Sequence, residues 1–507
     1  MKHIKMAPPK PTTLLFLLLH LFSAAPFTAP AIDYHRVNLR DIAFEPSHHH
    51  HHHHIHNISK PSRNGTANKH ELSLTLLHRD AVSGRSYASH RDRVADLLSR
   101  DSARAASITL RLSPEYYYHV DDFGSEVVSG LDEGSGEYFV RVGVGSPPKD
   151  QYLVVDSGSD VIWVQCQPCA QCYAQSDPVF DPAESSSFAG ITCDSPICGI
   201  LRSDKGGGGA SASEGCGGGG EGGGEEERCR YEVTYGDGSY TRGVLALETL
   251  TFGGSAEVRD VAIGCGQRNR GLFVGAAGLL GLGWGPMSLV GQLGGAAGGA
   301  FSYCLVTRSG ASGSSGSTGS LVLGRTAAVP VGAVWVPLAR NPRAPSFYYV
   351  GVAGLGVGGA RLPLLAELFR LGEDGGGGVV MDTGTAVTRL PGAAYAALRD
   401  AFAAAAPELP RAPGVSIFDA CYDLSGYESV RVPTVSFYFA DAGAGGAVLT
   451  LPARNFLIPV DGGGTFCFAF AAAADGGVSI LGNVQQEGIQ ITVDAANGFV
   501  GFGPNTC

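Results

Sequence analysis

The sequence Val-Val-Asp-Ser-Gly-Ser occupies residues 154–159, and a close copy of it, Val-Met-Asp-Thr-Gly-Thr, occupies residues 380–385. In both copies, apolar residues typical of a strand lead directly into a loop that carries one aspartate, Asp156 or Asp382. If the loops face each other, two carboxyl groups lie close together in a cleft of low dielectric, where they cannot both ionise and must share a proton. Such a pair can activate a water molecule by acid–base catalysis.

Each loop also contains the residue types that would support an aspartate. The glycine lets the backbone turn closely beneath the carboxyl group, and the hydroxyl residue after it can donate a hydrogen bond to an aspartate oxygen. The hydroxyl residue before the glycine could brace one loop against the other. One such loop would be a weak signal in a chain with 74 glycines, and a structural turn without catalysis is the alternative, but the doubling favours a site. The supporting loop residues are Ser157, Gly158, Ser159, Thr383, Gly384 and Thr385.

A second pair of matching segments follows the two loops. Gly-Leu-Leu-Gly-Leu-Gly at residues 278–283 corresponds to Ser-Ile-Leu-Gly-Asn at residues 479–483. Their shared glycines lie 125 and 100 residues after the upstream aspartates, so each copy spans a whole domain rather than a solenoid repeat. The simplest arrangement is two related lobes with one aspartate each, an N-terminal lobe of residues 126–338 and a C-terminal lobe of residues 339–507.

From residue 137 onward the chain consists of short β-rich runs that are broken by Gly, Pro and Asp. Helical spacing occurs at residues 287–293 and again at residues 393–406, where Tyr395, Leu398 and Phe402 share one face. We therefore predict an all-β, bilobal fold with few short helices and a cleft between the lobes.

The first 25 residues are typical of a secretory signal peptide. Lys2 and Lys5 precede a Leu-rich run at residues 14–22, and small residues follow at 23–25. The run is too short to span a bilayer, and Gly or charged residues interrupt every later candidate. We expect no membrane span and a route through the secretory pathway to the extracellular space or the vacuole, with the endoplasmic reticulum as a further possibility.

Residues 26–125 form a basic, histidine-rich prosegment candidate. They contain seven consecutive histidines at 48–54 and two glycosylation sequons, at Asn57 and Asn64. The histidine run is solvated filler or, as an alternative, a metal or pH sensor. Apolar and basic residues with partial helical spacing at 71–111 suggest a short helix that covers an acidic cleft.

Charge and histidine content exclude several functions. Residues 1–125 carry about +4 and residues 126–507 about −15, which argues against nucleic acid as a partner of the larger part. The opposite charges could hold the two parts together until carboxylates are protonated, or simply maintain solubility. All fifteen histidines lie at or before His119, so Ser-His, Cys-His and His-Glu-x-x-His chemistry is absent from the body. We expect no metal, because the aspartate pair lacks further ligands at matching spacing. We also expect no cofactor, and we expect the protein to be a monomer.

Twelve cysteines lie between Cys166 and Cys507. An even number in a secreted chain predicts six disulfides, although sequence alone cannot choose their connectivity. The spacing Cys166-x-x-Cys169-x-x-Cys172 leaves zinc binding or a redox dithiol as alternatives.

The chain resembles the pepsin-like aspartic endopeptidases, and among them the atypical plant group of nepenthesin-like proteins. The resemblance covers nearly all of residues 126–507 and is carried by four further segments, at 134–139, 235–239, 301–304 and 481–486. It implies two β lobes with a substrate cleft between them, protein or peptide substrates, and an acidic optimum. It also implies that Asp156 and Asp382 are the catalytic pair.

Further roles follow from the resemblance. Tyr235 and Gly236 correspond to the flap hairpin over the cleft, and Trp163 to the tryptophan that hydrogen-bonds the flap tyrosine. On their own, the residues around Tyr235 predict a hairpin turn, and core packing is the alternative role for Tyr235 and Trp163. The resemblance also implies a disulfide scheme, which pairs Cys166 with Cys169, Cys172 with Cys265, Cys193 with Cys229, Cys198 with Cys216, Cys304 with Cys507, and Cys421 with Cys467.

Two points depart from a simple family reading. Ser157 stands where most members have Thr, which keeps the hydroxyl and loses a methyl group, so we expect weaker packing rather than inactivity. The N-terminal segment is poorly matched, and we expect it to act as an intramolecular inhibitor of a secreted zymogen. The alternative function is a catalytically silent binding protein on the same fold, similar to plant xylanase inhibitors, which tend to lose the Asp-Thr/Ser-Gly loops that are intact here.

Overall fold

The architecture is known from a computed structural model of the chain. It describes residues 32–42, 72–82, 87–112, 138–203, 210–211, 228–235, 239–253, 256–271, 273, 275–294, 298–305, 319–324, 332–440, 446–474 and 476–504. The predicted signal peptide, the histidine run, Asn57, Asn64, Gly236, Cys216 and Cys507 lie outside the described residues.

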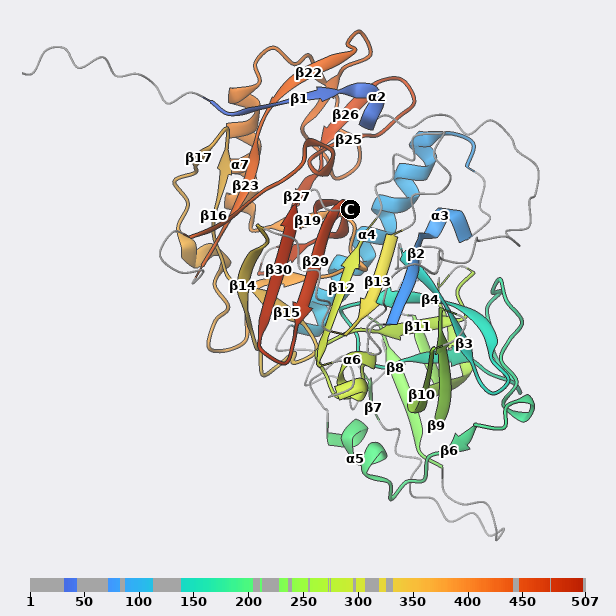
Figure 1. Cartoon of the computed structure of the whole chain (residues 1–507). Helices are drawn as coiled ribbons and strands as arrows, with labels where there is room; N and C mark the ends of the chain where they lie inside the picture. Colours follow the sequence, from blue (N-terminus) through green and yellow to red (C-terminus); the bar gives the residue numbers. More distant parts are fainter. Residues whose placement is uncertain are drawn as a thin grey trace, which may run out of the picture.

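Two β-rich lobes make up the body, as predicted (Figure 1). In the N-terminal lobe the longest strands, β9 and β10, form a hairpin that pairs antiparallel over most of its length. Strand β3 lies between β4 and β9 at one end. The strands of this lobe are β3 (Tyr138–Val144), β4 (Lys149–Asp156), β5 (Trp163–Gln165), β6 (Ala189–Gly190), β7 (Ala210–Ser211), β8 (Arg230–Thr234), β9 (Tyr240–Phe252), β10 (Ala256–Arg270) and β11 (Gly278–Gly281), with helices α5 (Pro196–Ser203) and α6 (Leu289–Leu293).

The C-terminal lobe contains two four-stranded sheets, in the orders β17-β16-β23-β24 and β20-β21-β26-β25. Its strands are β15 (Tyr348–Val350), β16 (Val352–Val357), β17 (Ala360–Arg361), β18 (Val379–Met381), β19 (Thr388–Leu390), β20 (Arg411–Ala412), β21 (Cys421–Asp423), β22 (Ser429–Pro433), β23 (Val435–Phe439), β24 (Ala447–Thr450), β25 (Leu457–Pro459), β26 (Thr465–Phe468), β27 (Phe470–Ala472) and β28 (Ser479–Leu481). Helix α7 (Gly392–Ala405) lies where helical spacing predicted it, with Tyr395, Leu398 and Phe402 buried.

A central antiparallel sheet joins the lobes. Its strands run in the order β3, β2, β13, β12, β29, β30 and β14. The strands not yet located are β2 (Leu72–His78), β12 (Ala300–Cys304), β13 (Gly319–Leu323), β14 (Val334–Ala339), β29 (Ile489–Asp494) and β30 (Phe499–Pro504). Because β29 and β30 come from the end of the chain and pair with β12 and β14, the sheet ties both halves of the sequence together (Figure 1).

The N-terminal segment contributes to both lobes and to the central sheet. Strand β1 (Tyr34–Asn38) pairs with β22 of the C-terminal lobe, and β2 lies between β3 and β13. The expected helix is present as α4 (His90–Leu112), but the apolar run before it forms a strand, because its alternating Leu74 and Leu76 both face the core. Short helices α2 (Leu39–Ile42) and α3 (Arg79–Val82) follow the two strands.

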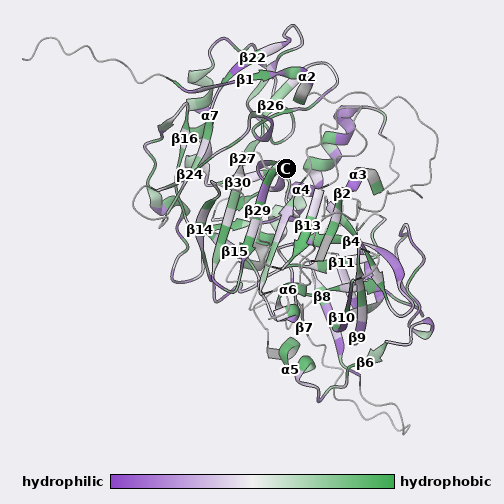
Figure 2. Ribbon diagram, viewed as in Figure 1, coloured by the Kyte–Doolittle hydropathy of each residue, from purple (hydrophilic) through white to green (hydrophobic). Residues whose placement is uncertain are grey.

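Helix α4 is amphipathic and begins with a side-chain cap. Ser89 accepts a hydrogen bond from the backbone N–H of Asp92 at 3.1 Å, and its own hydroxyl donates to the Asp92 carboxyl group at 2.8 Å. Along the helix, hydrophilic and hydrophobic residues are mixed (Figure 2). Val94, Leu97 and Leu98 are buried against the C-terminal lobe, so the helix is held by an apolar face.

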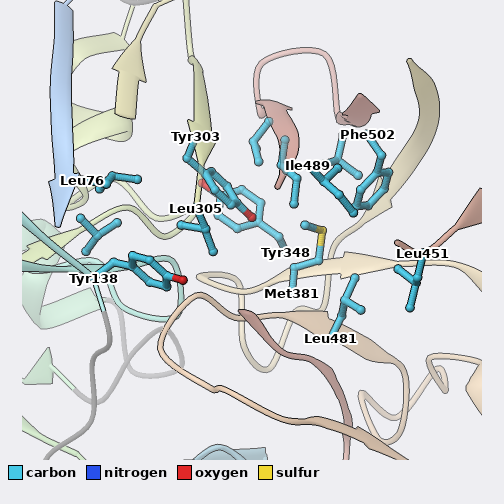
Figure 3. Close-up of a cluster of buried hydrophobic side chains, with 14 of the residues drawn as sticks. Leu76, Tyr138, Tyr303, Leu305, Tyr348, Met381, Leu451, Leu481, Ile489 and Phe502 are labelled. Atoms are coloured by element: carbon cyan, nitrogen blue, oxygen red, sulfur yellow. The ribbon is translucent and has the colours of Figure 1, made fainter. Parts of the chain in front are cut away.

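One large hydrophobic cluster contains residues of the N-terminal segment, of both lobes and of the central sheet as far as Phe502. Figure 3 shows side chains from β2, β3, β12 and β15 packed beside those of β18, β28, β29 and β30. Met381 and Leu481 lie in this core immediately beside the second aspartate loop. The labelled residues are Leu76, Tyr138, Tyr303, Leu305, Tyr348, Met381, Leu451, Leu481, Ile489 and Phe502. Burial of this cluster fixes the strands that carry the loops.

Two of the implied disulfides in the N-terminal lobe, Cys166–Cys169 and Cys172–Cys265, are wrong. The structure joins Cys166 to Cys265 and Cys169 to Cys172, with Cα–Cα distances of 5.3 and 6.0 Å. The reason is strand register: β5 pairs in parallel with β10 so that Val164 lies opposite Cys265, which brings the end of β5 to Cys265. Cys169 and Cys172 lie on the loop beyond β5, within reach of each other.

The implied pairs Cys193–Cys229 and Cys198–Cys216 are also wrong. Helix α5 carries Cys198 to the start of β8, where it is bonded to Cys229 at a Cα–Cα distance of 5.9 Å. The pair Cys421–Cys467 is confirmed, because β21 and β26 place these residues directly opposite each other. Cys193 and Cys304 are disulfide-bonded. Since Cys507 lies outside the described residues, its pairing with Cys304 stays a prediction.

Within the described ranges, no helix combines the length and the apolar character that crossing a membrane requires.

Candidate active site

The two aspartate loops have the same structural setting. Asp156 ends β4, which pairs in parallel with β11, and Asp382 follows β18, which pairs in parallel with β28. These pairings explain the second pair of matching segments in the sequence. A Cβ atom on Gly281 would lie 2.2 Å from the carbonyl oxygen of Asp160, and one on Gly482 would lie 2.6 Å from that of Ala386. Only glycine lets β11 and β28 pass so close to the loops.

Each carboxyl group accepts a hydrogen bond from the hydroxyl group predicted for it. The Ser159 hydroxyl donates to Asp156 Oδ2 at 2.6 Å, and the Thr385 hydroxyl donates to Asp382 Oδ2 at 2.6 Å. The backbone N–H of Gly158 donates to Asp156 Oδ1 at 3.0 Å. Both aspartates are buried, so these contacts fix the orientation of each carboxyl group.

Hydrogen bonds also join one loop to the other. The Ser157 N–H donates to Thr383 Oγ1 at 3.2 Å, and the Thr383 N–H donates to Ser157 Oγ at 3.0 Å. Thr383 Oγ1 in turn donates to the carbonyl oxygen of Val155 at 3.2 Å, and Asn483 Nδ2 donates to the Thr383 carbonyl at 2.9 Å. The bracing expected from these hydroxyl groups is therefore present, and serine at position 157 supplies it without the methyl group of threonine.

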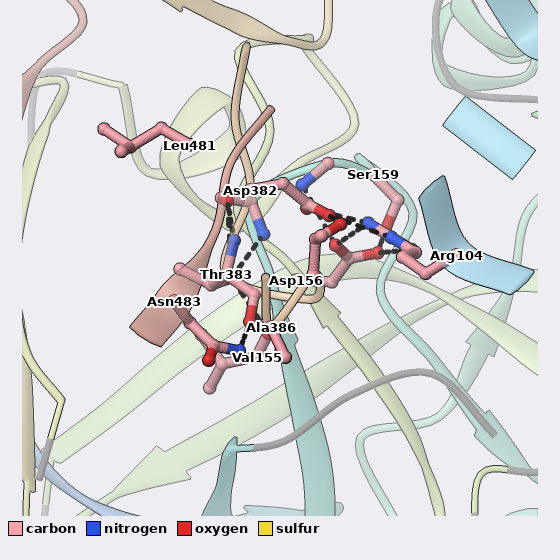
Figure 4. A network of polar contacts seen from close by, with 12 residues as sticks. Arg104, Val155, Asp156, Ser159, Asp382, Thr383, Ala386, Leu481 and Asn483 are labelled. Atoms are coloured by element: carbon pink, nitrogen blue, oxygen red, sulfur yellow. Dashed lines mark hydrogen bonds and ion pairs between the residues drawn. The ribbon is translucent and has the colours of Figure 1, made fainter. Parts of the chain in front are cut away.

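Arg104 of helix α4 lies between the two carboxyl groups (Figure 4). Its Nη2 atom donates to Asp156 Oδ1 at 2.7 Å and to Asp382 Oδ1 at 2.8 Å, and its Nε atom donates to Asp382 Oδ2 at 3.0 Å. Burial by itself would lower the pKa of Arg104, but attraction to the two aspartates outweighs it, and the pKa lies above its ordinary value. One nitrogen atom thus reaches both carboxyl groups at hydrogen-bond distance.

A second ion pair anchors helix α4 one turn away. Asp101 Oδ1 accepts hydrogen bonds from the backbone N–H groups of Ala386 and Val387 at 2.6 and 2.7 Å, and Oδ2 accepts one from the Arg389 guanidinium. Burial raises the pKa of Asp101, and the attraction of Arg389 offsets this only in part. Both side chains are buried, with 3% of Asp101 and 8% of Arg389 exposed.

Neither Arg104 nor Asp101 was identified from the sequence. Charged residues on a helix usually face solvent, so a charge on α4 carries no signal by itself. The available signal was position: Asp101 and Arg104 continue the helical face that contains Leu97, Leu98 and Ile108, all buried. Charges within an apolar stripe indicate buried partners.

The N-terminal lobe lines its side of the site with aromatic rings. Trp163 Nε1 donates a hydrogen bond to the Tyr235 hydroxyl at 2.9 Å, which is the contact that the resemblance implied. Both side chains are buried and pack edge-on against Phe273. Burial, followed by the nearby Asp156, raises the pKa of Tyr235. Tyr235 is thus within electrostatic reach of Asp156, while Gly236 lies outside the described residues.

Among the residues that the structure describes, no three His, Cys, Asp or Glu side chains are grouped as metal ligands would be. The cation between the aspartates is the guanidinium of Arg104.

Comparisons with known proteins agree with this geometry. The family profiles described as Xylanase inhibitor N-terminal and Xylanase inhibitor C-terminal match residues 138–325 and 347–504. The chain is 60% identical over 446 residues to the protein Aspartic protease in guard cell 2 of Arabidopsis thaliana, which covers 86% of this chain and 88% of that one. It is 38% identical over 378 residues to the aspartic proteinase nepenthesin-2 of Nepenthes gracilis, covering 74% and 78% of the two chains.

Solved structures support the fold alone, because their sequence identity is low. Conglutin gamma, a basic 7S globulin from lupine seeds, matches with a TM-score of 0.56 at 19% identity and covers 86% of this chain and 95% of that one. Basic 7S globulin from soybean matches with a TM-score of 0.54 at 19% identity, with coverage of 74% and 94%. Together with the identity to the curated relatives, these findings place the chain in the plant family of pepsin-like aspartic proteases, as an aspartic endopeptidase.

Proposed function

We propose that Asp156 and Asp382 are the catalytic pair and hydrolyse peptide bonds through a water molecule held between them. The observation that carries the proposal is the position of Arg104 Nη2, which lies 2.7 Å from one carboxylate and 2.8 Å from the other. A water molecule that replaces this nitrogen would donate a hydrogen bond to the ionised carboxylate and accept one from the protonated carboxyl group. The two carboxyl groups are therefore near enough to bind one water molecule in common.

In the proposed reaction, the ionised aspartate of the pair takes a proton from the water as it attacks the scissile carbonyl carbon. The protonated aspartate donates its proton to the carbonyl oxygen, which gives a tetrahedral diol. Collapse of the diol, with transfer of a proton to the leaving nitrogen, breaks the peptide bond without a covalent intermediate. The proton belongs to the pair rather than to either residue. Because the pair needs one proton, activity is expected at acidic pH.

We also propose that residues 26–125 are an inhibitory prosegment. Arg104 occupies the space between the aspartates, and its helix covers the site through the apolar contacts of Leu97 and Leu98. Protonation of the aspartates removes their attraction for Arg104 and favours release of α4. The enzyme would then be made with a signal peptide at residues 1–25, secreted or delivered to the vacuole as a zymogen, and cut before the lobes of residues 126–338 and 339–507.

The flap is the remaining part of the proposal. Tyr235 would close over the substrate, held in place by its hydrogen bond to Trp163. An aromatic ring there excludes water from the reacting atoms.

Acid digestion tests the proposal. The full chain is incubated with a protein substrate at pH 4 with and without the statine-type inhibitor pepstatin, and mass spectrometry maps the cut sites and the mature N-terminus. Pepstatin-sensitive cleavage, together with loss of residues up to about 125, is expected. A chain that cleaves nothing under these conditions would instead support the silent binding protein, and a chain that cleaves fully with an uncut N-terminus would rule out the inhibitory role of the prosegment.

A further inference from the structure

The site that holds Asp101 is built by the C-terminal lobe. Two backbone N–H groups, of Ala386 and Val387, point at one carboxylate oxygen from 2.6 and 2.7 Å, and the Arg389 guanidinium binds the other oxygen. This set of donors, called here the carboxylate cradle, matches both oxygens of an ionised carboxyl group. Its three members lie on the stretch of chain that leads from the second aspartate loop into β19.

The cradle does not depend on its occupant for its shape. Arg389 lies in β19, where it pairs opposite Ala471 of β27 and Ile480 of β28, so its backbone is fixed by two neighbouring strands. Ala386 and Val387 are buried among Phe418 and Val484. When helix α4 leaves, the cradle therefore remains in the cleft wall, while Asp101 leaves with the helix.

Removal of α4 leaves Arg389 without its anionic partner. Its ion pair in the described structure is with Asp101, and its other side-chain contact is with Ser102, which is also on α4. Its Nε atom is buried and has no hydrogen-bond partner among the described residues. A largely buried cation beside two outward-pointing N–H groups favours an anion in the same place.

The cradle lies within reach of a substrate that occupies the aspartate pair. Asp101 binds the cradle and Arg104 binds the aspartates, and these residues are three apart on one helix, which corresponds to a rise of about 4.5 Å. An extended peptide advances about 3.3 Å per residue. A side chain one to three residues from the scissile bond therefore reaches the cradle.

We propose that Arg389, with the N–H groups of Ala386 and Val387, forms a subsite that binds an acidic side chain of the peptide substrate. The proposal rests on the proposed function of the aspartate pair. Asp101 is then an internal mimic of this side chain, and the enzyme prefers Asp or Glu over the matching amide at one position near the cleaved bond. The nearby buried Val94, Leu97 and Leu98 of α4 indicate apolar neighbours for that acidic residue.

The test uses C-terminally amidated fluorogenic peptides, so that a preference arises from a side chain and not from a terminal carboxylate. All peptides share one apolar pair at the cleaved bond, and a single Glu or Gln is placed at each of the three positions on either side. The activated enzyme, without its N-terminal segment, is assayed at pH 5, where an exposed Glu is mostly ionised. The readout is the ratio of kcat/KM for Glu over Gln at each position.

The wild-type enzyme is expected to show a ratio of roughly ten or more at one position, as for a charge-assisted hydrogen bond, and a ratio near one elsewhere. Arg389→Gln should bring the large ratio down to within about twofold of one, and Arg389→Lys should leave an intermediate value because it keeps the charge without the fork. Arg399→Gln is the matched control, since Arg399 is a more exposed arginine of α7 that pairs with Asp400 and Asp419. It should retain the wild-type ratio.

A ratio near one at every position in the wild type, or a large ratio that survives in Arg389→Gln, would overturn the cradle as a subsite. If Arg389→Gln does not fold, the wild-type ratios and Arg389→Lys decide the question. Failure of the proposed function gives a different result: no peptide is then cleaved in a pepstatin-sensitive manner, whatever residue it carries.

Discussion

The two aspartate loops are nearly alike in their hydrogen bonds and unlike in what surrounds them. In each, a hydroxyl group two residues after the Thr or Ser of the loop donates to the carboxyl group at 2.6 Å, and Ser157 and Thr383 exchange hydrogen bonds across the boundary. The first loop is bordered by the aromatic rings of Trp163 and Tyr235, whereas the second leads into the carboxylate cradle at Arg389. In the proposed function the two loops thus share the chemistry evenly, while the contacts that recognise the substrate differ between the lobes.

The loops and the residues around them are under different geometric requirements. Duplicated loops must keep the same geometry, because the shared proton requires both carboxyl groups to be positioned alike. The residues that surround each loop need not share one geometry, so they can differ between the lobes. The N-terminal segment meets both parts, since Arg104 contacts the shared pair and Asp101 contacts the wall of one lobe.

The first prediction concerns the equal contribution of the two aspartates to catalysis. Asp156→Asn and Asp382→Asn keep the shape of the side chain and remove the carboxylate, so each should lower kcat by roughly 10²–10⁴-fold. The double variant should be no worse than the poorer single variant, because the residues act as a unit. Fluorogenic peptide cleavage at pH 4 measures this, with thermal unfolding as the control for folding. Wild-type activity in either variant would contradict the claim that both aspartates are needed for catalysis.

Arg104 is the residue that couples the N-terminal segment to both loops at once. Arg104→Gln removes one partner of a buried ion pair, which costs about 3–5 kcal/mol and shifts the balance from docked to released helix by roughly 10² or more. The full-length variant, with its N-terminus intact by mass spectrometry, should cleave peptide where the wild type does not. Arg91→Gln is the control, since Arg91 is an exposed arginine of the same helix. Equal inhibition of Arg104→Gln and wild type would contradict the role of Arg104.

The pH dependence of release separates the two contacts of α4. Burial raises the pKa of Asp101 above its ordinary value of 3.8, because it outweighs Arg389 and the two N–H groups of the cradle, which lower this pKa. As the pH falls, the docked helix therefore takes up a proton at Asp101 more readily than the released helix does. Acidification therefore favours docking at Asp101, so the proposed acid release depends on the contact of Arg104 with the Asp156–Asp382 pair.

Asp101→Asn tests whether acidification favours docking of α4 at this residue. The amide oxygen can still accept both N–H groups, but the proton uptake and the pairing with Arg389 are lost, so the midpoint of acid release should move to higher pH. Release is followed by size-exclusion chromatography of the cut protein as the pH is lowered. A midpoint that moves to lower pH would show that Asp101, rather than the catalytic pair, triggers release.

The smallest expected effect concerns the aromatic wall. Tyr235→Phe removes the acceptor of the buried Trp163 N–H, which costs about 1 kcal/mol and should lower kcat/KM about fivefold. The Glu over Gln ratio at the cradle should stay unchanged, because it belongs to the other lobe. A Tyr235→Phe enzyme in which this ratio collapses would show that the walls do not act separately.

The doubled loops were readable from the sequence because each carries its own chemistry within six residues. The all-β, bilobal fold and helix α7 were also predictable, since Tyr395, Leu398 and Phe402 repeat at helical spacing. The cross-loop contact of Ser157 with Thr383 followed from the same reasoning, because a hydroxyl group in a buried loop needs a partner.

What the sequence did not predict depends on long-range register. The pairing of Cys166 with Cys265 is set by the alignment of β5 with β10, which no local pattern specifies. The sequence predicts a helical region where strand β2 lies, because the strand forms by pairing with β3 and β13, which are distant in sequence. In the sequence, Arg104 and Asp101 look like ordinary charged residues of a helix. Their partners, the aspartates and the cradle, are distant in sequence and are known only from the fold.

Titration with pepstatin tests the shared carboxylate pair most directly. The acid-activated enzyme is titrated at pH 4 while peptide cleavage is followed, and the uncut chain is titrated for binding at neutral pH. The account predicts that cleavage falls linearly to zero at one inhibitor per activated chain and that the uncut chain, with Arg104 between the aspartates, binds none. Cleavage that persists at saturating inhibitor, or full binding to the uncut chain, would contradict it.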